Sequence, residues 1–375
     1  MIQTQNPFFE NNHTPHGTVP FDRIAVEHYA PAIREGIRRQ NAEIDAIVCN
    51  PAPADFQNTI LALELSGELL RRAETVFDNL LSAETNDAMQ ELAKELMPLL
   101  SEHANNITLN ERLFERVKTA YEHRYDEALT AEQRKLTEDT YEGFVRSGAN
   151  LQGADKEKYR ELSRQLSRLT LQFSENNLKE TNDYQLVLTD ESQLKGLPES
   201  AIEAARETAK EKGQEGWIFT LQAPSYVPFL TYADNRELRK ELYMAYNTKC
   251  THPNDYNNLD IVKQLVNTRL EIARLLGYKD YASYKLERRM AQNSANVYHL
   301  LSQLLEAYKP TALKEYAEVQ SLAREEQGED FVLMPWDWSY YSQKLKDRTF
   351  NINDEMLRPY FELENVKEGV FSLAT

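Results

Sequence analysis

Residues 159–173, YRELSRQLSRLTLQF, decide the fold class of this chain. Tyr159, Leu162, Leu166, Leu169 and Phe173 follow one another at alternating steps of three and four residues. That spacing places all five side chains on one face of an α-helix over about four turns. Because so long an apolar stripe needs a partner surface, we expect a central helix in a mainly α-helical protein.

The same spacing recurs upstream of this helix. The isoleucines between residues 33 and 47 share one helix face, and Pro31 is expected to open that helix. A second, long helix is expected over residues 56–81, with Asp55 as its N-cap. Asn110 is suited to cap another helix, and Thr130 with Gln133 has the form of a capping box.

Downstream, one short segment has the character of β-structure. Residues 184–188 alternate between polar and apolar, and residues 217–221 are β-branched and aromatic. A helix over residues 198–212 is expected to separate them, which gives one small strand pair. The chain is then helical again, with a long pattern over residues 296–327 that only Pro310 interrupts.

Four consecutive segments follow from these patterns: an extended N-terminal arm (1–22), an N-terminal helical region (23–182), a small β-containing segment (183–223) and a second helical region (224–375). No fixed repeat of about 30 to 45 residues runs through them, which disfavours a helical solenoid. The last residues form an amphipathic pattern without a stop signal, so the sequence is expected to be cut inside a helix.

Composition and charge exclude several classes of protein. The 375 residues include 43 Lys and Arg against 60 Asp and Glu, a net charge of −17 that disfavours a nucleic acid partner. No apolar run approaches the roughly 18 residues of a membrane span. The first residues lack the features of a secretory signal, and the two cysteines, Cys49 and Cys250, are far apart. We therefore expect a cytoplasmic protein; a signal removed before residue 1 would leave no trace here.

Motifs that carry chemistry are scarce. Metal-dependent hydrolysis through HExxH needs two histidines four residues apart, and none of the seven histidines has such a partner. His13 and His16 form a close pair, for which a solvated arm is the favoured interpretation over metal binding. Carboxylate pairs such as Glu64 with Glu68, or Glu91 with Glu95, are expected by chance among 60 acidic residues and indicate solvated faces.

Two stretches, 224–232 and 335–341, carry the densest aromatic and proline content. Their side chains are candidates for a peptide groove, since Tyr and Trp combine contact area with a polar tip. The alternative, favoured by the large number of aromatic residues, is a core between helices. The candidates for a substrate channel are Tyr226, Phe229, Tyr232, Trp336, Trp338 and Tyr340.

A series of short stretches runs from end to end of the chain, over residues 6–9, 20–22, 27–33, 83–87, 173–178, 216–232, 235–239, 275–278, 336–341 and 359–361. This ordered series resembles the thimet oligopeptidase family of zinc metallopeptidases, and within it the peptidyl-dipeptidase Dcp branch. Each stretch alone is weakly specific, whereas the series in family order is fairly specific. The resemblance covers the N-terminal part of the family's pattern only.

The resemblance implies a multi-helix lobe of a zincin-type peptidase that cleaves short peptides with one zinc ion. The family's HExxH motif, its further zinc ligand and its transition-state residues have no counterpart here, so no catalytic or metal-binding residue is carried over. What the resemblance implies is a channel wall that admits short, unfolded peptides and needs a C-terminal catalytic part as its partner. On this interpretation the chain binds no cofactor and is inactive alone, while zinc belongs to the full-length parent.

In a second interpretation the chain has the peptidase scaffold but is not part of an enzyme. The chain would then be a helical module that binds peptides or other proteins. An in-frame HExxH beyond residue 375 would favour the first interpretation, and a native stop codon the second.

Overall fold

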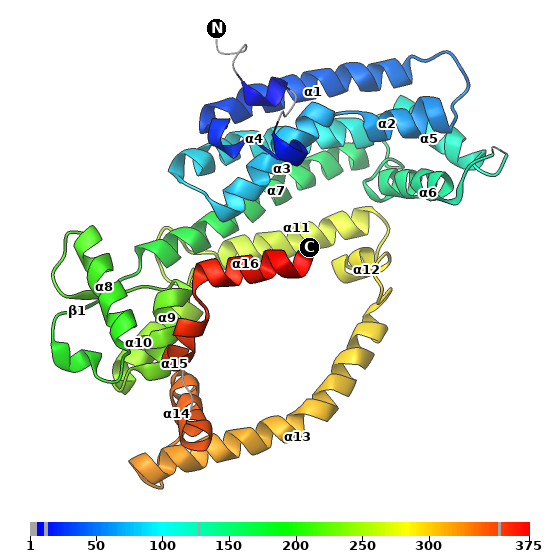
Figure 1. The fold of residues 1–375 in the computed structure, drawn as a ribbon. Helices are drawn as coiled ribbons and strands as arrows, with labels where there is room; N and C mark the ends of the chain where they lie inside the picture. The colour runs from blue at the N-terminus through cyan, green and yellow to red at the C-terminus, as the bar shows by residue number, and fades with distance from the viewer. Residues whose placement is uncertain (1–5, 11–13, 127, 352–353) are drawn as a thin grey trace. The chain divides into compact units, whose positions relative to one another are not determined.

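The computed structural model describes residues 6–10, 14–126, 128–351 and 354–375 as helices joined by short connections, with one strand pair (Figure 1). The first helices are α1 (Val26–Val48), α2 (Ala62–Leu65), α3 (Glu68–Ala83), α4 (Asp87–Thr108), α5 (Glu111–Glu122), α6 (Ala131–Arg146) and α7 (Gly153–Asp183). They are followed by α8 (Glu199–Glu211), α9 (Ala223–Tyr232), α10 (Arg236–Asn247), α11 (Leu259–Leu275), α12 (Tyr281–Leu286), α13 (Ser294–Gln327), α14 (Trp338–Phe350), α15 (Asp354–Leu357) and α16 (Leu363–Ala374). This confirms the expected mainly α-helical fold.

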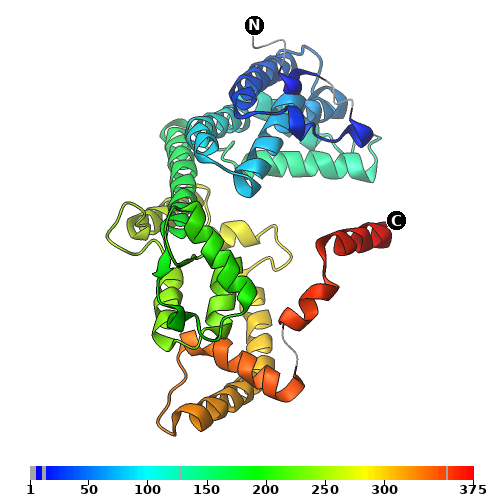
Figure 2. The ribbon, with the colours of Figure 1, turned by 60° about the vertical axis from the view of Figure 1, so that its left-hand side comes forward.

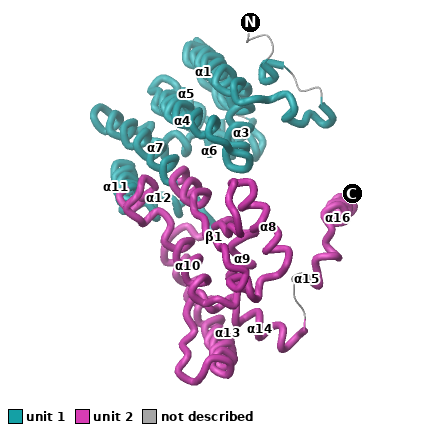
Figure 3. Tube along the Cα trace, turned by 90° about the vertical axis from the view of Figure 1, so that its left-hand side faces the viewer, with its two compact units in different colours: residues 1–173, 261–290 teal, residues 174–260, 291–375 magenta. Residues whose placement is uncertain are grey.

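The chain divides into two compact units, each built from two separate stretches of sequence (Figure 3). Unit 1 contains residues 1–173 and 261–290, and unit 2 contains residues 174–260 and 291–375. The four consecutive segments expected from the sequence remain predictions, because order along the chain and compactness in space divide a protein differently.

Unit 1 is held by the packing of α1 against α3 and α4. Tyr29 and Ile33 of α1 are buried against Phe77 of α3, whose ring lies 5.1 Å from that of Tyr29. Gly36 allows the two helices to approach, since a Cβ there would lie 2.7 Å from the Leu70 Cα. A second core in the same unit joins α1, α5 and α6 with the turn that follows Asp55.

Two helices in unit 1 differ from the sequence-based expectation, one in its start and one in its continuity. Helix α1 begins at Val26, so Pro31 lies inside the helix instead of opening it. The expected long helix over residues 56–81 begins as predicted, where Asp55 accepts a hydrogen bond of 2.7 Å from the Asn58 N–H. It is broken, however, at Gly67, whose φ of +70° is left-handed. The backbone N–H of Gly67 donates instead to Glu43 of α1, at 2.7 Å.

The stripe that decides the fold class lies on α7 as predicted. Tyr159, Leu162 and Leu169 are buried, and Leu166 packs beside them. Phe173, at the end of the stripe, is 39% exposed. The stripe packs against α11, through Ile261, Leu265 and Ile272. Helix α7 therefore joins two distant parts of the sequence in unit 1.

Unit 2 contains the predicted strand pair. The strands β1 (Leu186–Leu188) and β2 (Trp217–Phe219) are antiparallel, with Val187 opposite Ile218. Helix α8 lies between them in sequence, as expected, and a core formed by the strands with α8, α9 and α10 includes Phe219 and Phe229. A second core joins α13 to α14 through Val319 and Tyr341.

Two of the last helices of unit 2 stand out: α13 is long, and α16 is exposed along its whole length. Helix α13 runs unbroken through Pro310 over 34 residues, so the expected interruption there is wrong (Figure 2). Helix α16 confirms the amphipathic pattern at the end of the sequence, and all of its residues are exposed. Among the described residues, no helix is both long and apolar enough to cross a membrane.

Candidate functional site

The first aromatic stretch, residues 224–232, forms helix α9 of unit 2. Phe229 is fully buried, with its ring 4.6 Å from that of Phe219 in an edge-to-face arrangement. Tyr226 is half-buried and stacks on Tyr246 of α10 at 4.4 Å. Burial raises the pKa of Tyr226 to about 12, so its phenol stays neutral at physiological pH. Tyr232 is also half-buried.

The second stretch lies on the short helix η6 (Pro335–Asp337) and the start of α14. Trp336 is half-buried, with its ring 6.2 Å from that of Tyr243. Trp338 is 40% exposed and stacks on Tyr316 of α13 at 6.3 Å. Tyr340 is buried and its hydroxyl donates to Asp234 at 2.8 Å. The structure thus brings both stretches into unit 2, where Phe229 and Tyr340 serve packing and Trp338 reaches the surface.

A buried ion-pair network connects the two stretches. The side chain of Asp337 is fully buried and pairs with Arg236 at 2.7 Å and with Arg239 at 2.9 Å. Arg239, itself 1% exposed, also donates to the Ala233 carbonyl at the end of α9, at 2.7 Å. Oδ2 of Asp337, the oxygen that pairs with Arg236, also accepts from the Met334 N–H at 3.0 Å.

The network fixes the charge state of its carboxylate. Burial alone would raise the pKa of Asp337, but hydrogen bonds from Arg236, the Met334 N–H and Arg239 outweigh it and lower that pKa. The ring of Tyr340 lies under the Arg239 guanidinium at 4.0 Å. These contacts hold the end of α9 and the start of α14 in one arrangement, and with them the aromatic side chains that both carry.

Sequence reasoning did not identify this network. Arg236, Arg239 and Asp337 were noted only as members of stretches that carry the family resemblance. A charged residue between two tryptophans was the available signal, since a carboxylate in so apolar a setting needs a cationic partner. Which arginine supplies it could not be found from spacing, because the residues lie about a hundred positions apart.

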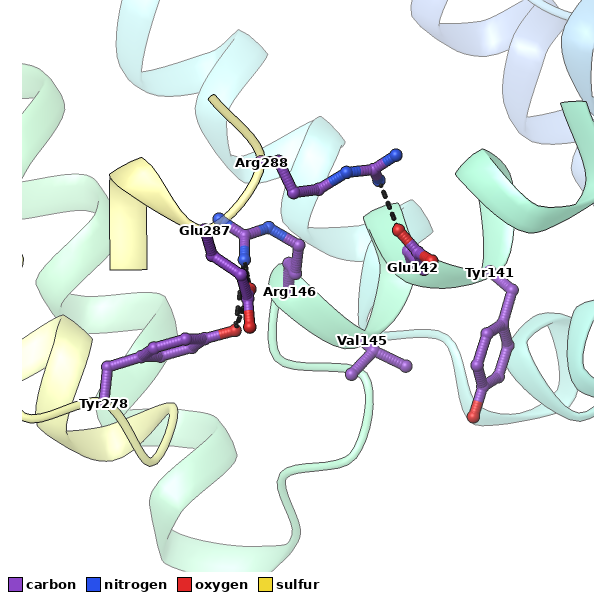
Figure 4. A pocket seen from close by; sticks show the side chains of 7 residues that line it. All are labelled: Tyr141, Glu142, Val145, Arg146, Tyr278, Glu287 and Arg288. Carbon is purple, nitrogen blue, oxygen red and sulfur yellow. Dashed lines mark hydrogen bonds and ion pairs between the residues drawn. The ribbon is translucent and has the colours of Figure 1, made fainter. Parts of the chain in front are cut away.

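Unit 1 carries a pocket of about 540 Å³, lined by Tyr141, Glu142, Val145, Arg146, Tyr278, Glu287 and Arg288 (Figure 4). Arg146 of α6 pairs with Glu287 and lies 3.1 Å from the Tyr278 hydroxyl. Arg288 pairs with Glu142 at 2.9 Å and also with Asp139. Each arginine of this pocket already pairs with a carboxylate. These ion pairs attach residues 278–288 to helix α6, which is the role that the structure shows for them.

Residues that could hold a metal ion do not converge. Among the described residues, no group of three or more His, Cys, Asp or Glu side chains could hold a metal. His13 lies outside the described residues, and His16 is exposed. In the pair Glu91 with Glu95 each carboxylate has another partner: Glu91 pairs with Lys94 at 2.5 Å, and Glu95 pairs with Arg34.

Comparisons with known proteins point to one family. The model of peptidase family M3 matches residues 229–375, which begin in α9. Dipeptidyl carboxypeptidase of Escherichia coli (strain K12) is 37% identical over 372 residues, 99% of this chain and 54% of that relative. Oligopeptidase A of Salmonella typhimurium is 33% identical over 358 residues, 94% of this chain and 52% of that relative.

The similarity extends beyond bacteria. Organellar oligopeptidase A of Arabidopsis thaliana is 28% identical over 379 residues, covering 99% of this chain and 47% of that relative. The chain spans about half the length of the curated relatives it matches. The resemblance expected from the sequence is therefore confirmed: the chain is similar to peptidases of family M3.

Proposed function

We propose that this chain forms a peptide-receiving part of an oligopeptidase or peptidyl-dipeptidase, and that peptide hydrolysis requires further polypeptide. The single observation that carries the proposal is the alignment of 99% of the chain with a dipeptidyl carboxypeptidase, of which it covers 54%. The match of the family model to residues 229–375 supports it, and it includes the second aromatic stretch and the end of the first, from Phe229 onward.

The aromatic side chains give the proposed channel wall its chemistry. Trp338 is 40% exposed, and Tyr226, Tyr232 and Trp336 are half-buried. Such side chains offer apolar area to a peptide, and their accessible polar atoms can bond to its backbone. The hydroxyl of Tyr232 is buried, so that side chain would contribute apolar area alone. Phe229 and Tyr340 would act behind this surface, by packing. The candidate contacts to a peptide are therefore the four accessible aromatic side chains.

The zinc ion that the resemblance implies does not fit the residues present. The sequence has no HExxH, and the described residues bring no three donors together. We therefore place the metal and the water that it would activate on residues outside this chain. No catalytic step is assigned to any side chain described here.

Hydrolysis of short peptides tests the proposal. The purified chain, with and without added zinc, is expected to leave the peptides intact. A chimera that joins this chain to the part of Escherichia coli dipeptidyl carboxypeptidase that it does not match is expected to hydrolyse them. Enzyme-like hydrolysis by the chain alone, retained through further purification, would contradict the proposal.

The second candidate is a module that binds peptides without cleaving them. The exposed ring of Trp338 favours it, because a surface tryptophan can contact a ligand whether or not catalysis follows. Titration with short peptides, followed by tryptophan fluorescence, tests this candidate. A saturable change for the isolated chain that Trp338→Ala reduces, together with an inactive chimera, would favour the module over the enzyme part.

A further inference from the structure

Helix α13 carries an apolar stripe that is covered only at one end. Its members are Tyr298, Leu301, Leu305, Tyr308, Ala312, Tyr316, Val319 and Ala323, at steps of three and four residues. This spacing keeps them on one face of the helix. Val319 and Ala323 are buried, and they pack with Leu333, Tyr340 and Tyr341. The stripe is therefore a packing face where α14 reaches it.

Beyond the contact with α14 the same stripe faces solvent. Every residue from 298 to 318 is exposed, a length of about 30 Å of helix. Leu301 is 53% exposed, Leu305 62% and Tyr308 66%. Leu300 and Leu304 widen the patch. Soluble proteins rarely expose a contiguous apolar surface of more than a few hundred Å², so this face calls for a partner.

The charges on the helix indicate that the partner is protein and not a membrane surface. Between residues 298 and 318 there are three carboxylates (Glu306, Glu315 and Glu318) and two lysines (Lys309 and Lys314). Helices that lie on anionic membranes carry a strongly basic polar face. The near-neutral polar face of α13 and the net charge of −17 both disfavour that use.

The part of the relatives that this chain does not match indicates what the partner is. The Escherichia coli relative aligns with 99% of this chain, yet this chain covers only 54% of that protein. We propose that the stripe of α13 from Tyr298 to Ala312 is the docking face for the polypeptide that corresponds to the unmatched part of the relatives. This proposal deepens the proposed function and rests on it, because that polypeptide is the part assigned there to hydrolysis.

The test compares the isolated chain with the chimera described above, by hydroxyl-radical footprinting. In the isolated chain Leu305 and Tyr308 should be modified readily, and in the chimera their modification should fall several-fold. Unchanged modification in a folded chimera would overturn the proposal. Protection already present in an isolated chain that is dimeric by light scattering would also overturn it, because the face would then belong to a second copy.

Two matched double variants locate the contact. Leu301→Glu with Leu305→Glu adds two carboxylates to the stripe, and His299→Glu with Gln303→Glu adds two to the opposite face at the same spacing. The first pair should lower the melting temperature of the chimera by several degrees and leave the isolated chain unchanged. The second pair should change neither. Equal effects of the two pairs on the chimera would contradict the proposal.

Co-expression of the two polypeptides as separate chains keeps the test decisive if the chimera fails to fold. Affinity-tagged wild-type chain and the His299→Glu, Gln303→Glu variant should retain the other polypeptide, and the Leu301→Glu, Leu305→Glu variant should lose it. No retention, or equal retention by all three, would overturn the proposal. Docking through α13 without peptide hydrolysis would refute the proposed function alone, and hydrolysis that does not depend on α13 would refute this inference alone.

Discussion

Asp337 is the residue on which the arrangement of unit 2 depends most directly. Its fully buried carboxylate is shared by Arg236 and Arg239. Replacing it by Asn leaves the buried Arg239 guanidinium without a counter-charge, which typically costs about 3–5 kcal/mol of folding free energy. We expect Asp337→Asn to lower the urea midpoint strongly, and Asp330→Asn, at an exposed position, to leave it nearly unchanged.

The pH dependence of stability gives the same residue a second readout. Because the pKa of Asp337 is lowered in the folded protein, its contribution is fully present above the unfolded pKa of about 3.9. The contribution is lost as the pH falls from there towards the folded pKa. Asp337→Asn should therefore show a shallower loss of stability in acid than the wild-type chain. Parallel acid profiles would show that the pKa of Asp337 is not lowered in the folded protein.

His103 gives a pH dependence in a different window. It is buried, and its Nε2 lies 2.8 Å from Oε1 of Gln40, which suits a neutral imidazole that donates there. Burial lowers the pKa of His103, so protonation favours the unfolded chain. Stability should hold above the unfolded pKa of about 6.5 and decline as the pH falls below it.

The measurement for His103 is the urea midpoint at pH 7.5 and at pH 5.5. The wild-type chain should lose stability between the two values, and His103→Gln should lose less. His299→Gln, on the exposed face of α13, serves as the control and should follow the wild type. If the His103 variant and the wild type lose the same amount, the decline belongs to other groups.

Single residues were predictable from the sequence where the determinant is local. Asn110 caps α5 by accepting from the Leu113 N–H, and Thr130 and Gln133 form the expected capping box. Such motifs act within four residues and leave a signature in the sequence. The two arginines that pair with Asp337 lie about a hundred residues away from it, and no local sequence motif indicates them.

At the scale of elements, helix faces were predictable and helix breaks were not. The stripe on α7 was predicted because periodicity reports burial directly. Pro31 was expected to open a helix and Pro310 to interrupt one, yet both lie inside unbroken helices. At Pro31 the packing of α1 against α3 can keep the helix running, since propensity is only a weak local preference. The described residues around Pro310 are all exposed, so packing within this chain does not explain why α13 continues there.

The break at Gly67 gives a test at this scale. Gly67 has a left-handed φ of +70°, and a Cβ there would overlap the Gln40 side chain. Left-handed backbone costs an L-residue roughly 1–2 kcal/mol, so Gly67→Ala should destabilise the chain by at least that amount. The measurement is the free energy of unfolding from urea titration.

Gly143 provides the matched control. It lies inside α6 and has no atom within 4 Å of the position that a Cβ would take. Gly143→Ala should stabilise the chain by about 1 kcal/mol, because Ala is the better helix former. Opposite signs for the two substitutions are expected, and stabilisation by both would show that the break at Gly67 is not present in solution.

The division of the whole molecule was beyond the sequence patterns. Each unit contains a second stretch from later in the sequence: residues 261–290 belong to unit 1, and residues 291–375 belong to unit 2. Periodicity shows that a helix face is buried but not which distant helix covers it. The same limit applied to the candidate channel: the aromatic content of residues 224–232 and 335–341 stood out, but the separation of buried Phe229 from exposed Trp338 required the structure.

Separate cores in the two units lead to a prediction for the whole molecule. Gly67→Ala perturbs the core that contains Tyr29 and Phe77, whereas Asp337→Asn perturbs the one beside Tyr340 and Tyr341. Amide hydrogen exchange follows local opening, and a core opens as a cooperative group. Exchange should therefore rise in α1 and α3 for the first variant, and in α9, α10 and α14 for the second. If Asp337→Asn raised exchange in α1 and α3 as much as in α14, the two units would unfold as one cooperative group. The lower urea midpoint of this variant would then report the stability of the whole chain and not that of unit 2.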